Sequence, residues 1–438
     1  MAKKIVAQIF DEDNYIKKNR EYKKECLAKI KEFNANGKKT IAIFTDAYYP
    51  IVDGVVRVLD NYAKRLTNDY NVVVCAPLHK GHVSRQKYLV LGAGSLYFKA
   101  VNYDLAFPTL DGDFNDLIRK LRIDIIHVHS PFSLGSFAIS LAKRRKIPVV
   151  ATFHSQYKKD FYQATKSEFL TSMLLSNIMK VFNKATEVWT MHQASLETLI
   201  SYGFKGDHYL IENATDFVKP NNINELEKKV RKEFDVKDDE KVFLFVGRLV
   251  KTKNIIFLVE ALKALKDRGV KFRMFFVGSG PDKKELSEKV SELGLDNEVV
   301  LVGSVTDRNR LYSFYQMADL FLFPSLYDVS SIVQIEAACF KTPAVFLKGS
   351  VTSCTVTDNV NGFVAENSLE GFVDKVYNIV NEKGLIEKIG EQANRDLYIT
   401  WEQVIEKAKA RYEMLMKKNE RLHNVKRVLK ESKKVSKK

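Results

Sequence analysis

Short runs of β-branched and aromatic apolar residues alternate with amphipathic helical stretches along this chain, and the alternation occurs twice. Such runs form strands, whereas stretches with apolar residues three and four apart form helices. Regular alternation of the two predicts parallel sheets covered by helices on both faces. The first series of predicted strands covers residues 40–45, 72–76, 123–130, 148–153, 187–190 and 209–212. The second covers residues 242–246, 272–277, 299–302, 320–323, 344–347 and 362–365.

Two such series predict an α/β chain with two doubly wound, Rossmann-like domains that face each other across a cleft. Ligands of such domains bind outside the carboxyl ends of the strands. We expect a charged helical extension (1–38), a first domain (39–217), a second domain (218–399), and a C-terminal helix with a basic tail (400–438). The apolar stripe of that last helix predicts that it packs back on the first domain.

Bulk composition excludes several classes of protein. Hydrophobic residues make up 45% of the 438 residues, which is enough to bury real cores and excludes a disordered chain. No apolar run approaches the roughly 18 residues that span a bilayer. The first residues lack the apolar core of a signal peptide. The four cysteines are scattered, which fits a reducing compartment, so we expect a cytoplasmic protein.

The net charge of +16 is concentrated at the C-terminus. Residues 417–438 contain eight lysines and two arginines against two glutamates, a net +8. A run like this is a solvated tail or a surface for anionic membrane lipids, and nucleic acid is a third possible partner. We do not expect nucleic-acid binding as the main role, because no basic motif with interleaved aromatic residues accompanies the charge.

A pair of acidic residues flanks a predicted helix start in the second series. Asp328 lies on the loop after a strand, and Glu336 lies along the helix that follows. The free backbone N–H groups of Ser330, Ser331 and Ile332 at that helix start can hold a diphosphate. The alternative is an ordinary helix capped by Asp328 or Ser330, with Glu336 in solvent.

Two further segments of the second series lie at predicted strand ends. Arg248 and Lys253 follow the strand-end Gly247, and two cations there can neutralise a diphosphate without a metal. Their alternative is a pair of ordinary surface cations. Gly278 opens a Gly-x-Gly turn at the next strand end, which is weak evidence for phosphate binding. The helix-start residues after it make a structural role the better explanation.

The first series also places chemistry at strand ends. Gly54 precedes the first helix and lets a ligand approach the backbone closely, although a plain turn explains it too. One strand ends with His127 and His129, which we interpret as lying on opposite faces, so that only one can face the cleft. His154 ends the next strand. The alternative for each of these histidines is a structural role.

An Asp-x-Asp pair, Asp111 and Asp113, is the type of motif with which some glycosyltransferases hold a divalent ion. It stands in a polar loop before a helix, so we expect Asp113 to cap that helix. We predict no metal site.

In order and spacing, these segments resemble glycosyltransferase family 4, which has the two-domain GT-B fold. The similarity runs from about residue 40 to about residue 412. It implies that a first, acceptor domain and a second, donor domain transfer a hexose from a nucleotide-diphosphate sugar, UDP being favoured, to a lipid or saccharide acceptor. It also implies retention of configuration, independence of metals and no cofactor.

The resemblance assigns roles to the donor residues. Arg248 and Lys253 would hold the diphosphate, Glu336 the ribose, and Asp328 the transferred sugar. The family usually has Glu where Asp328 stands, and Phe-Gly where this chain has Ser330 and Ser331. We interpret these departures as an altered choice of donor. A catalytically inactive partner subunit and a sugar-nucleotide epimerase or phosphorylase of the same fold remain alternatives.

In the first domain, the resemblance implies that Gly54 lies by the phosphates, that His129 contacts the sugar, and that His154 binds substrate. Asn213 matches a turn that would shape the cleft near the hinge. The acceptor could be a membrane lipid, because residues 157–184 mix apolar side chains with lysines. The alternative for that stretch is a core-packed helix with a wet face.

Overall fold

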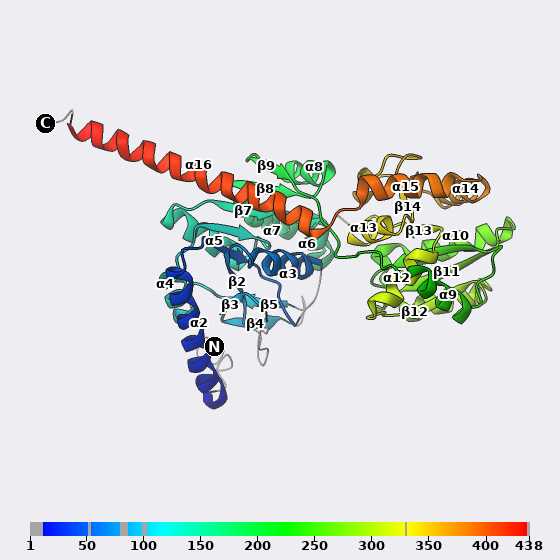
Figure 1. The fold of residues 1–438 in the computed structure, drawn as a ribbon, viewed down its shortest axis with the longest axis horizontal. Helices are drawn as coiled ribbons and strands as arrows, with labels where there is room; N and C mark the ends of the chain where they lie inside the picture. Colours follow the sequence, from blue (N-terminus) through cyan, green and yellow to red (C-terminus); the bar gives the residue numbers. More distant parts are fainter. Residues whose placement is uncertain (1–11, 51–53, 79–85, 99–102, 329–330, 436–438) are drawn as a thin grey trace. The chain divides into compact units, whose positions relative to one another are not determined.

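The computed structural model describes residues 12–50, 54–78, 86–98, 103–328 and 331–435 (Figure 1). The chain divides into two compact units. The first comprises Met1–Met191, Ser195–Glu212 and Glu402–Lys438, and the second comprises His192–Ala194 and Asn213–Trp401. Each unit has its own parallel sheet and its own buried core.

Seven parallel strands form the sheet of the first unit, in the order β3-β2-β1-β6-β7-β8-β9. β1 and β6 are neighbours, and the chain winds outward from them in opposite directions. This arrangement makes their carboxyl ends the switch point at which ligands of doubly wound sheets bind. The strands are β1 (Thr40–Phe44), β2 (Asn71–Pro77), β3 (Leu89–Ala93), β6 (Ile125–Val128), β7 (Val149–Thr152), β8 (Glu187–Thr190) and β9 (His208–Leu210).

Helices flank this sheet, and the last of them comes from the far end of the chain. Val404, Ile405, Ala408, Tyr412 and Leu415 of α16 are buried against the first unit, as their spacing of three and four residues requires. The helices are α2 (Glu12–Ala35), α3 (Gly54–Leu66), α4 (Gly112–Lys120), α5 (Ser133–Arg145), α6 (Tyr157–Thr165), α7 (Glu168–Phe182), α8 (Gln193–Ser201) and α16 (Trp401–Val435).

Six parallel strands form the second sheet, in the order β12-β11-β10-β13-β14-β15, with its switch point between β10 and β13. They are β10 (Lys241–Val246), β11 (Phe272–Val277), β12 (Val299–Gly303), β13 (Leu320–Phe323), β14 (Ala344–Leu347) and β15 (Phe363–Ala365). The helices are α9 (Ile223–Glu233), α10 (Ile255–Asp267), α11 (Lys283–Glu292), α12 (Arg308–Met317), α13 (Ile332–Cys339), α14 (Leu369–Asn381) and α15 (Leu385–Leu397).

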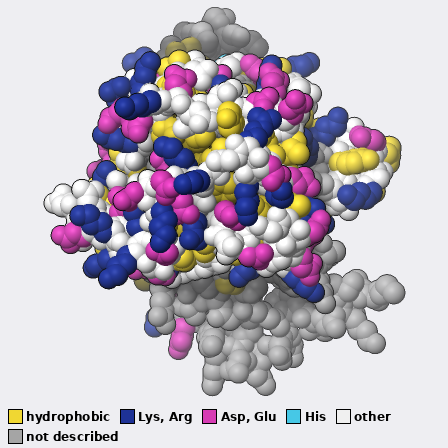
Figure 2. Space-filling model, turned by 90° about the vertical axis from the view of Figure 1, so that its right-hand side faces the viewer, with side chains coloured by type: hydrophobic (Ala, Val, Ile, Leu, Met, Phe, Trp, Pro, Cys, Tyr) yellow, Lys and Arg dark blue, Asp and Glu magenta, His cyan; other side chains and the backbone are white. Residues whose placement is uncertain are grey.

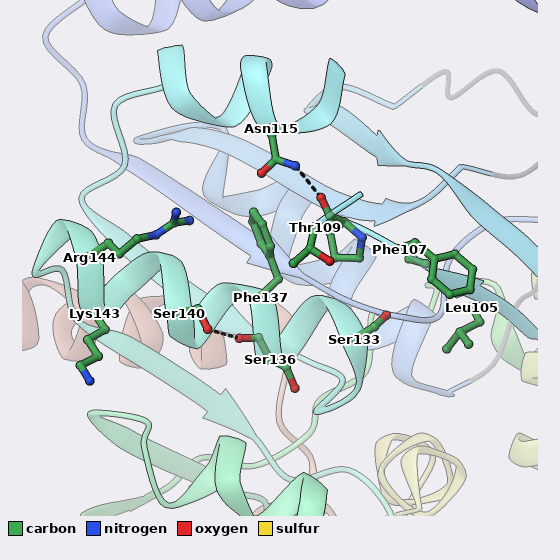
Figure 3. Close-up of a pocket in the computed structure, with 12 residues that line it drawn as sticks. Leu105, Phe107, Thr109, Asn115, Ser133, Ser136, Phe137, Ser140, Lys143 and Arg144 are labelled. Atoms are coloured by element: carbon green, nitrogen blue, oxygen red, sulfur yellow. Dashed lines mark hydrogen bonds between the residues drawn. The ribbon is translucent and has the colours of Figure 1, made fainter. Parts of the chain in front are cut away.

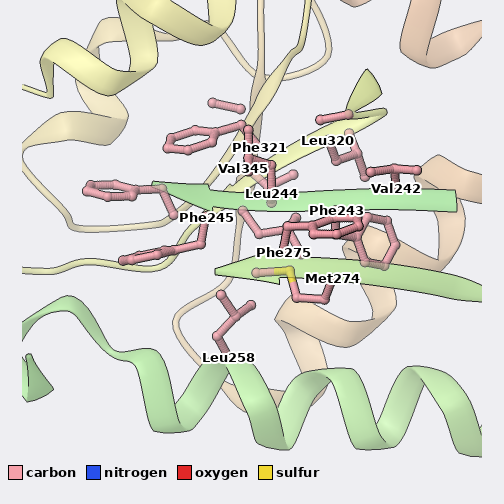
Figure 4. Close-up of a cluster of buried hydrophobic side chains, with 14 of the residues drawn as sticks. Val242, Phe243, Leu244, Phe245, Leu258, Met274, Phe275, Leu320, Phe321 and Val345 are labelled. Atoms are coloured by element: carbon pink, nitrogen blue, oxygen red, sulfur yellow. The ribbon is translucent and has the colours of Figure 1, made fainter. Parts of the chain in front are cut away.

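The second core explains why these strands read as unbroken apolar runs. β10 and β13 bury side chains on both faces, and Leu258 of α10 packs on one of them (Figure 4). A strand in a parallel sheet that is covered on both sides has no face to give to polar residues.

All twelve predicted strands are confirmed, and with them the predicted α/β class with two doubly wound sheets. The prediction missed β3 and the antiparallel hairpin of β4 (Ser95–Phe98) and β5 (Tyr103–Ala106). β3 is a partly exposed edge strand that contains Gly92, and it therefore lacks a clean apolar pattern.

Charged side chains of both signs are interspersed on the face drawn in Figure 2, and hydrophobic ones are scattered among them. Within the described part of the chain, no helix is both long enough and apolar enough to cross a membrane.

Candidate functional site

The switch point of the second unit brings together the loops that follow β10 and β13. Asn254 joins them, because its side-chain amide donates a hydrogen bond to the backbone oxygen of Pro324 at 3.1 Å. Arg248 and Lys253 come from the first loop and Asp328 from the second. These predicted residues therefore lie at the edge where a ligand is expected.

Lys253 and Asp328 form an ion pair there, through Lys253 Nζ and Asp328 Oδ1. Their side chains are only 17% and 18% exposed. The ammonium also lies 5.4 Å from the centre of the Phe323 ring. Asp328 Oδ2 is buried and has no hydrogen-bond partner among the described residues. A buried carboxylate oxygen without a donor is costly, and a ligand hydroxyl would satisfy it.

The start of α13 also contains a buried polar group without a hydrogen-bond partner among the described residues. Ser331 is the N-cap residue, yet its side chain accepts no capping hydrogen bond. Its hydroxyl oxygen is buried and has no partner in the described part of the chain. Ile332 begins the helix, so its N–H is one of the donors that a helix start leaves free for an anion. Ser330 lies outside the described residues.

Arg248 and Glu336 differ in the contacts that their side chains make within the protein. Arg248 is exposed and forms no ion pair with any described residue, so its guanidinium can turn to a ligand. Glu336 Oε2 accepts a hydrogen bond from the Tyr315 hydroxyl at 2.6 Å. That carboxylate and burial raise the pKa of Tyr315, burial being the larger cause. A ligand of Glu336 would thus meet a carboxylate that Tyr315 already orients.

Gly278 has a structural explanation. Its φ of +141° is disfavoured for residues with a side chain, and a Cβ there would lie 1.9 Å from the backbone oxygen of Gly247. Close packing of two strand-end loops therefore requires this glycine without any ligand.

Asn213, the predicted turn residue, is a buried residue of the second unit. Asp216, three residues further along the chain, forms an ion pair with Arg308 of the same unit.

The switch point of the first unit collects the histidines. His127 is fully buried, and both its nitrogens are bonded: Nδ1 to the Tyr412 hydroxyl at 2.6 Å, and Nε2 to the Thr152 hydroxyl at 2.7 Å. His129 bonds through Nδ1 to His154 Nε2 at 3.0 Å, and its own Nε2 is buried without a partner among the described residues. This difference favours His129 over His127 as the ligand-binding histidine.

The expectation that His127 and His129 lie on opposite faces is wrong. Their ring centres are 4.1 Å apart. Side chains alternate along a strand, so residues two apart share a face, and the geometry that we invoked predicts the observed arrangement. Burial is the main reason that the pKa of each ring is well below 6.5, so both stay neutral at pH 7. Burial also lowers the pKa of His154, to about 4.

Gly54 and Asp46 also lie in the segment that follows β1. Gly54 begins α3, and a Cβ added to it would meet no described atom within 4 Å, so packing does not explain the glycine. Asp46, which the sequence analysis did not single out, accepts hydrogen bonds from the Ser133 hydroxyl at 2.7 Å and the Leu134 N–H at 2.9 Å. It thereby fixes the start of α5. Burial raises its pKa to about 6.

The Asp-x-Asp pair is structural in part, but the predicted cap is the wrong residue. Asp111 caps α4 by accepting from the Phe114 N–H at 2.9 Å, and it also accepts from the Gly94 N–H. Asp113 lies in the first turn and pairs with Lys23 of α2 at 2.6 Å. The N-cap position lies one residue before the first helical residue. Because α4 begins at Gly112, Asp111 and not Asp113 occupies that position.

The first unit also contains an open cavity of about 1020 Å³ between β5, α4 and α5 (Figure 3). Phe137 and Pro108 supply apolar wall, Ser133, Ser136 and Ser140 follow one another along α5, and Arg144 stands at the far end. None of the predicted site residues that the structure describes lines this cavity.

Known proteins match both halves of the chain. The family model of group 1 glycosyl transferases matches residues 226–396, and that of glycosyltransferase family 4 matches residues 52–218. The α-monoglucosyldiacylglycerol synthase of Acholeplasma laidlawii is 25% identical over 335 residues, which cover 74% of this chain and 83% of the relative. The enzyme of the same name from Streptococcus pneumoniae is 23% identical and covers 80% and 82%.

Solved structures show the same fold. Anabaena HepE in complex with UDP superimposes with a TM-score of 0.69 at 17% identity, over 86% of this chain and all of that one. Sucrose-phosphate synthase from Thermosynechococcus elongatus gives a TM-score of 0.70 at 19% identity, over 86% and 99%. Together with the two parallel sheets, these similarities confirm the predicted GT-B fold.

Proposed function

This chain belongs to the family 4 glycosyltransferases, and from that premise we propose that it transfers a hexose from a UDP-sugar to a lipid acceptor with retention of configuration. The observation that carries the proposal is the Lys253–Asp328 ion pair beside the start of α13, where the second Asp328 oxygen and the Ser331 hydroxyl have no hydrogen-bond partner among the residues that the structure describes. A nucleotide sugar brings a diphosphate and sugar hydroxyls, which complement these groups.

In the proposed donor complex, the diphosphate lies at the α13 start, where the Ile332 N–H and the Ser331 hydroxyl donate to it. Arg248 and Lys253 contribute charge. When the bond from the anomeric carbon to the diphosphate breaks, negative charge grows on the leaving oxygen, and these cations stabilise it without a metal ion. Lys253 can serve both partners, because an ammonium has three N–H donors and Asp328 occupies one.

The proposed sugar contacts use the remaining polar atoms. Asp328 Oδ2 accepts a hydrogen bond from a hydroxyl of the transferred hexose, and the Glu336 carboxylate accepts hydrogen bonds from the ribose hydroxyls. Asp328 is one methylene shorter than the glutamate that the family usually has there, so its carboxylate reaches less far into the site. We therefore propose that this position helps to select the hexose.

Support for a lipid acceptor comes from the relatives' names and from the surface of the first unit. Both α-monoglucosyldiacylglycerol synthases are named for a glycolipid product. The start of α7 exposes Phe169 (78%), Leu170 (41%) and Met173 (48%). Lys158, Lys159 and Lys166 are exposed on or next to α6. Apolar side chains surrounded by lysines suit an anionic membrane surface.

The end of α7 agrees with the alternative that we gave for residues 157–184, a helix packed on the core. Its buried side chains there are Ile178, Met179, Val181 and Phe182. α7 therefore packs on the core at its C-terminal end and exposes apolar side chains at its N-terminal start. We propose that the enzyme works at the cytoplasmic face of a membrane, docked through the exposed start of α7 and the basic tail.

Thermal shifts with nucleoside diphosphates and their sugars test the donor site. We expect UDP to raise the stability in EDTA by about 2.7 kcal/mol at a hundredfold excess over Kd. The shift should vanish in Arg248→Ala. Lys251→Ala is the matched control, since Lys251 belongs to the same loop but pairs with Glu285 at 2.8 Å. It should keep the shift.

Transfer is measured separately, with UDP-hexoses and diacylglycerol in mixed vesicles containing EDTA. A glycolipid product whose anomeric configuration matches the donor by NMR is the expected result. Inversion would overturn the retaining mechanism, and loss of activity in EDTA would overturn metal independence. UDP binding without transfer to any lipid or saccharide would favour the catalytically inactive alternative.

A further inference from the structure

His129 and His154 share a hydrogen bond whose geometry is unusually well defined. The nitrogens are 3.0 Å apart, the ring centres are 5.1 Å apart, and the ring planes differ by 19°. Ring centres this far apart, for nitrogens this close, require the two nitrogens to face each other along the line of centres. The hydrogen bond therefore lies near both ring planes, along the direction of the lone pair and the N–H bond.

Only two arrangements of protons satisfy this bond. Burial lowers the pKa of both rings, so each is neutral and carries one N–H. In the first arrangement His154 Nε2–H donates to His129 Nδ1, and both rings are protonated on Nε2. In the second His129 Nδ1–H donates to His154 Nε2, and both rings are protonated on Nδ1. A neutral imidazole intrinsically prefers the Nε2-protonated form, so the first arrangement keeps both rings in their favoured tautomer.

We propose that His154 is a positioning residue that fixes His129 as the Nε2-protonated tautomer and thereby presents a neutral N–H donor to the substrate. The hydrogen bond made by one ring nitrogen decides the state of the other. His129 Nε2 is the buried nitrogen that lacks a partner among the described residues, so its N–H needs an acceptor oxygen. That the acceptor belongs to the donor sugar rests on the function proposed above.

The described residues around His129 contact its ring but form no hydrogen bond with Nε2. Its ring lies 4.1 Å from that of His127 and 5.7 Å from that of Tyr62, centre to centre. His127 cannot take over the role, because Tyr412 and Thr152 already engage both its nitrogens. His129 also cannot act as a base in this arrangement, because its only lone pair in the ring plane accepts the bond from His154.

Nitrogen NMR of the protein labelled with ¹⁵N-histidine tests the tautomer without any substrate. We expect His129, assigned by its loss in His129→Gln, to show a protonated Nε2 and an unprotonated Nδ1. His154→Gln should preserve this state, because the glutamine amide N–H₂ can replace the donor. His154→Leu should allow His129 to populate both tautomers. A protonated Nδ1 in the unmodified protein would overturn the proposal, and so would an unchanged tautomer in His154→Leu.

Kinetics provide a second readout. His154→Leu should lower kcat at least tenfold while the UDP-induced thermal shift, which reports the second unit, remains. His154→Gln should recover most of the loss. Equal losses in both variants would indicate that His154 only fills space, and would contradict the proposal. If no donor is transferred by the unmodified protein, the proposed function fails, and the NMR result still decides the tautomer.

Discussion

Lys253 and Asp328, 75 residues apart in the chain, form an ion pair where the loops after β10 and β13 meet. Neighbouring parallel strands end at the same edge of their sheet, so the β10–β13 pairing brings the loops together. The second carboxylate oxygen of Asp328 has no hydrogen-bond partner in the described part of the chain. A fully self-sufficient structural ion pair would satisfy both oxygens, so this geometry favours a binding role.

Replacing either partner should have a distinct effect. Lys253→Met should lower kcat about 10²–10³-fold and weaken the UDP-induced thermal shift, because it removes a cation from the diphosphate. Asp328→Asn should lower kcat while the UDP shift persists, because it weakens the sugar contact and leaves the charge of Lys253 available to the diphosphate. Transfer rates and thermal shifts on the same preparations check this. Activity of Lys253→Met within twofold of the unmodified protein would remove Lys253 from the proposed site.

The same pair predicts a coupling in stability. Lys253→Met leaves a mostly buried carboxylate unpaired, whereas the double variant with Asp328→Asn does not. We expect the double variant to be more stable than Lys253→Met by about 1–3 kcal/mol, from urea-unfolding curves. Lys251→Met serves as the control, and Asp328→Asn should not rescue it.

The attachment of α16 to the first unit depends on a second ion pair. Glu187 is 2% exposed and is bound by the Arg411 guanidinium and by the Trp189 N–H at 2.8 Å. Arg411→Met should destabilise the first unit by about 3–5 kcal/mol, since it leaves the buried Glu187 carboxylate without its cationic partner. Arg119→Met removes an arginine of the first unit whose side chain is 78% exposed, and it should change stability by less than about 0.5 kcal/mol. Comparable losses in both variants, measured by urea unfolding, would show that Glu187 tolerates solvation.

Two buried histidines, His127 and His129, and the half-buried His154 lead us to expect a loss of stability in acid. Burial holds the folded pKa of His127, His129 and His154 below 6.5, so the unfolded chain binds more protons below that pH. Their contribution is complete above pH 6.5 and falls as the pH decreases, toward about 4 for His154. Each such proton steepens the decline by about 1.4 kcal/mol per pH unit at most. His154→Gln should therefore decline less steeply between pH 6.5 and 4.5 in urea-unfolding series.

The contribution of Asp46 to stability changes with pH in the opposite direction, so Asp46 serves as a control. Its folded pKa of about 6 lies above the unfolded value, so its contribution is complete below pH 3.8 and falls as the pH rises through 6. Asp46→Asn keeps an oxygen for Ser133 and Leu134 and removes this opposing term. The variant should consequently lose more stability than the unmodified protein on acidification from pH 6.5 to 4.5. An identical pH profile would mean that Asp46 does not titrate in this range.

Membrane docking predicts a salt-sensitive association with anionic vesicles. Phe169→Ser combined with Met173→Ser should reduce co-sedimentation, because both side chains are exposed at the start of α7. Leu110→Ser is the matched control, since Leu110 is 82% exposed elsewhere on the first unit. High salt should release the protein by screening the lysines. If the unmodified protein stays in the supernatant at low and high salt, the docking surface is refuted.

Local patterning is sufficient to locate twelve of the fifteen described strands and the loops that carry Arg248, Asp328 and His129. A strand covered on both faces must be apolar along its length, and a strand end next to a helix start must carry turn or polar residues. Both requirements act over a few neighbouring residues, so the amino-acid order displays them directly. The edge strand β3 and the β4–β5 hairpin escape this logic, because partial exposure relaxes the requirement.

Partner choice depends on the three-dimensional arrangement of the strands and helices. The Tyr412 hydroxyl reaches His127 across 285 positions of sequence, and this contact exists only because α16 packs on the first unit. Both nitrogens of His127 are hydrogen-bonded, whereas Nε2 of His129, directly after the same strand, has no partner among the described residues and is left for a ligand. Hydrogen bonds require atoms within about 3 Å, a distance that strand order and helix packing set and that local sequence does not encode.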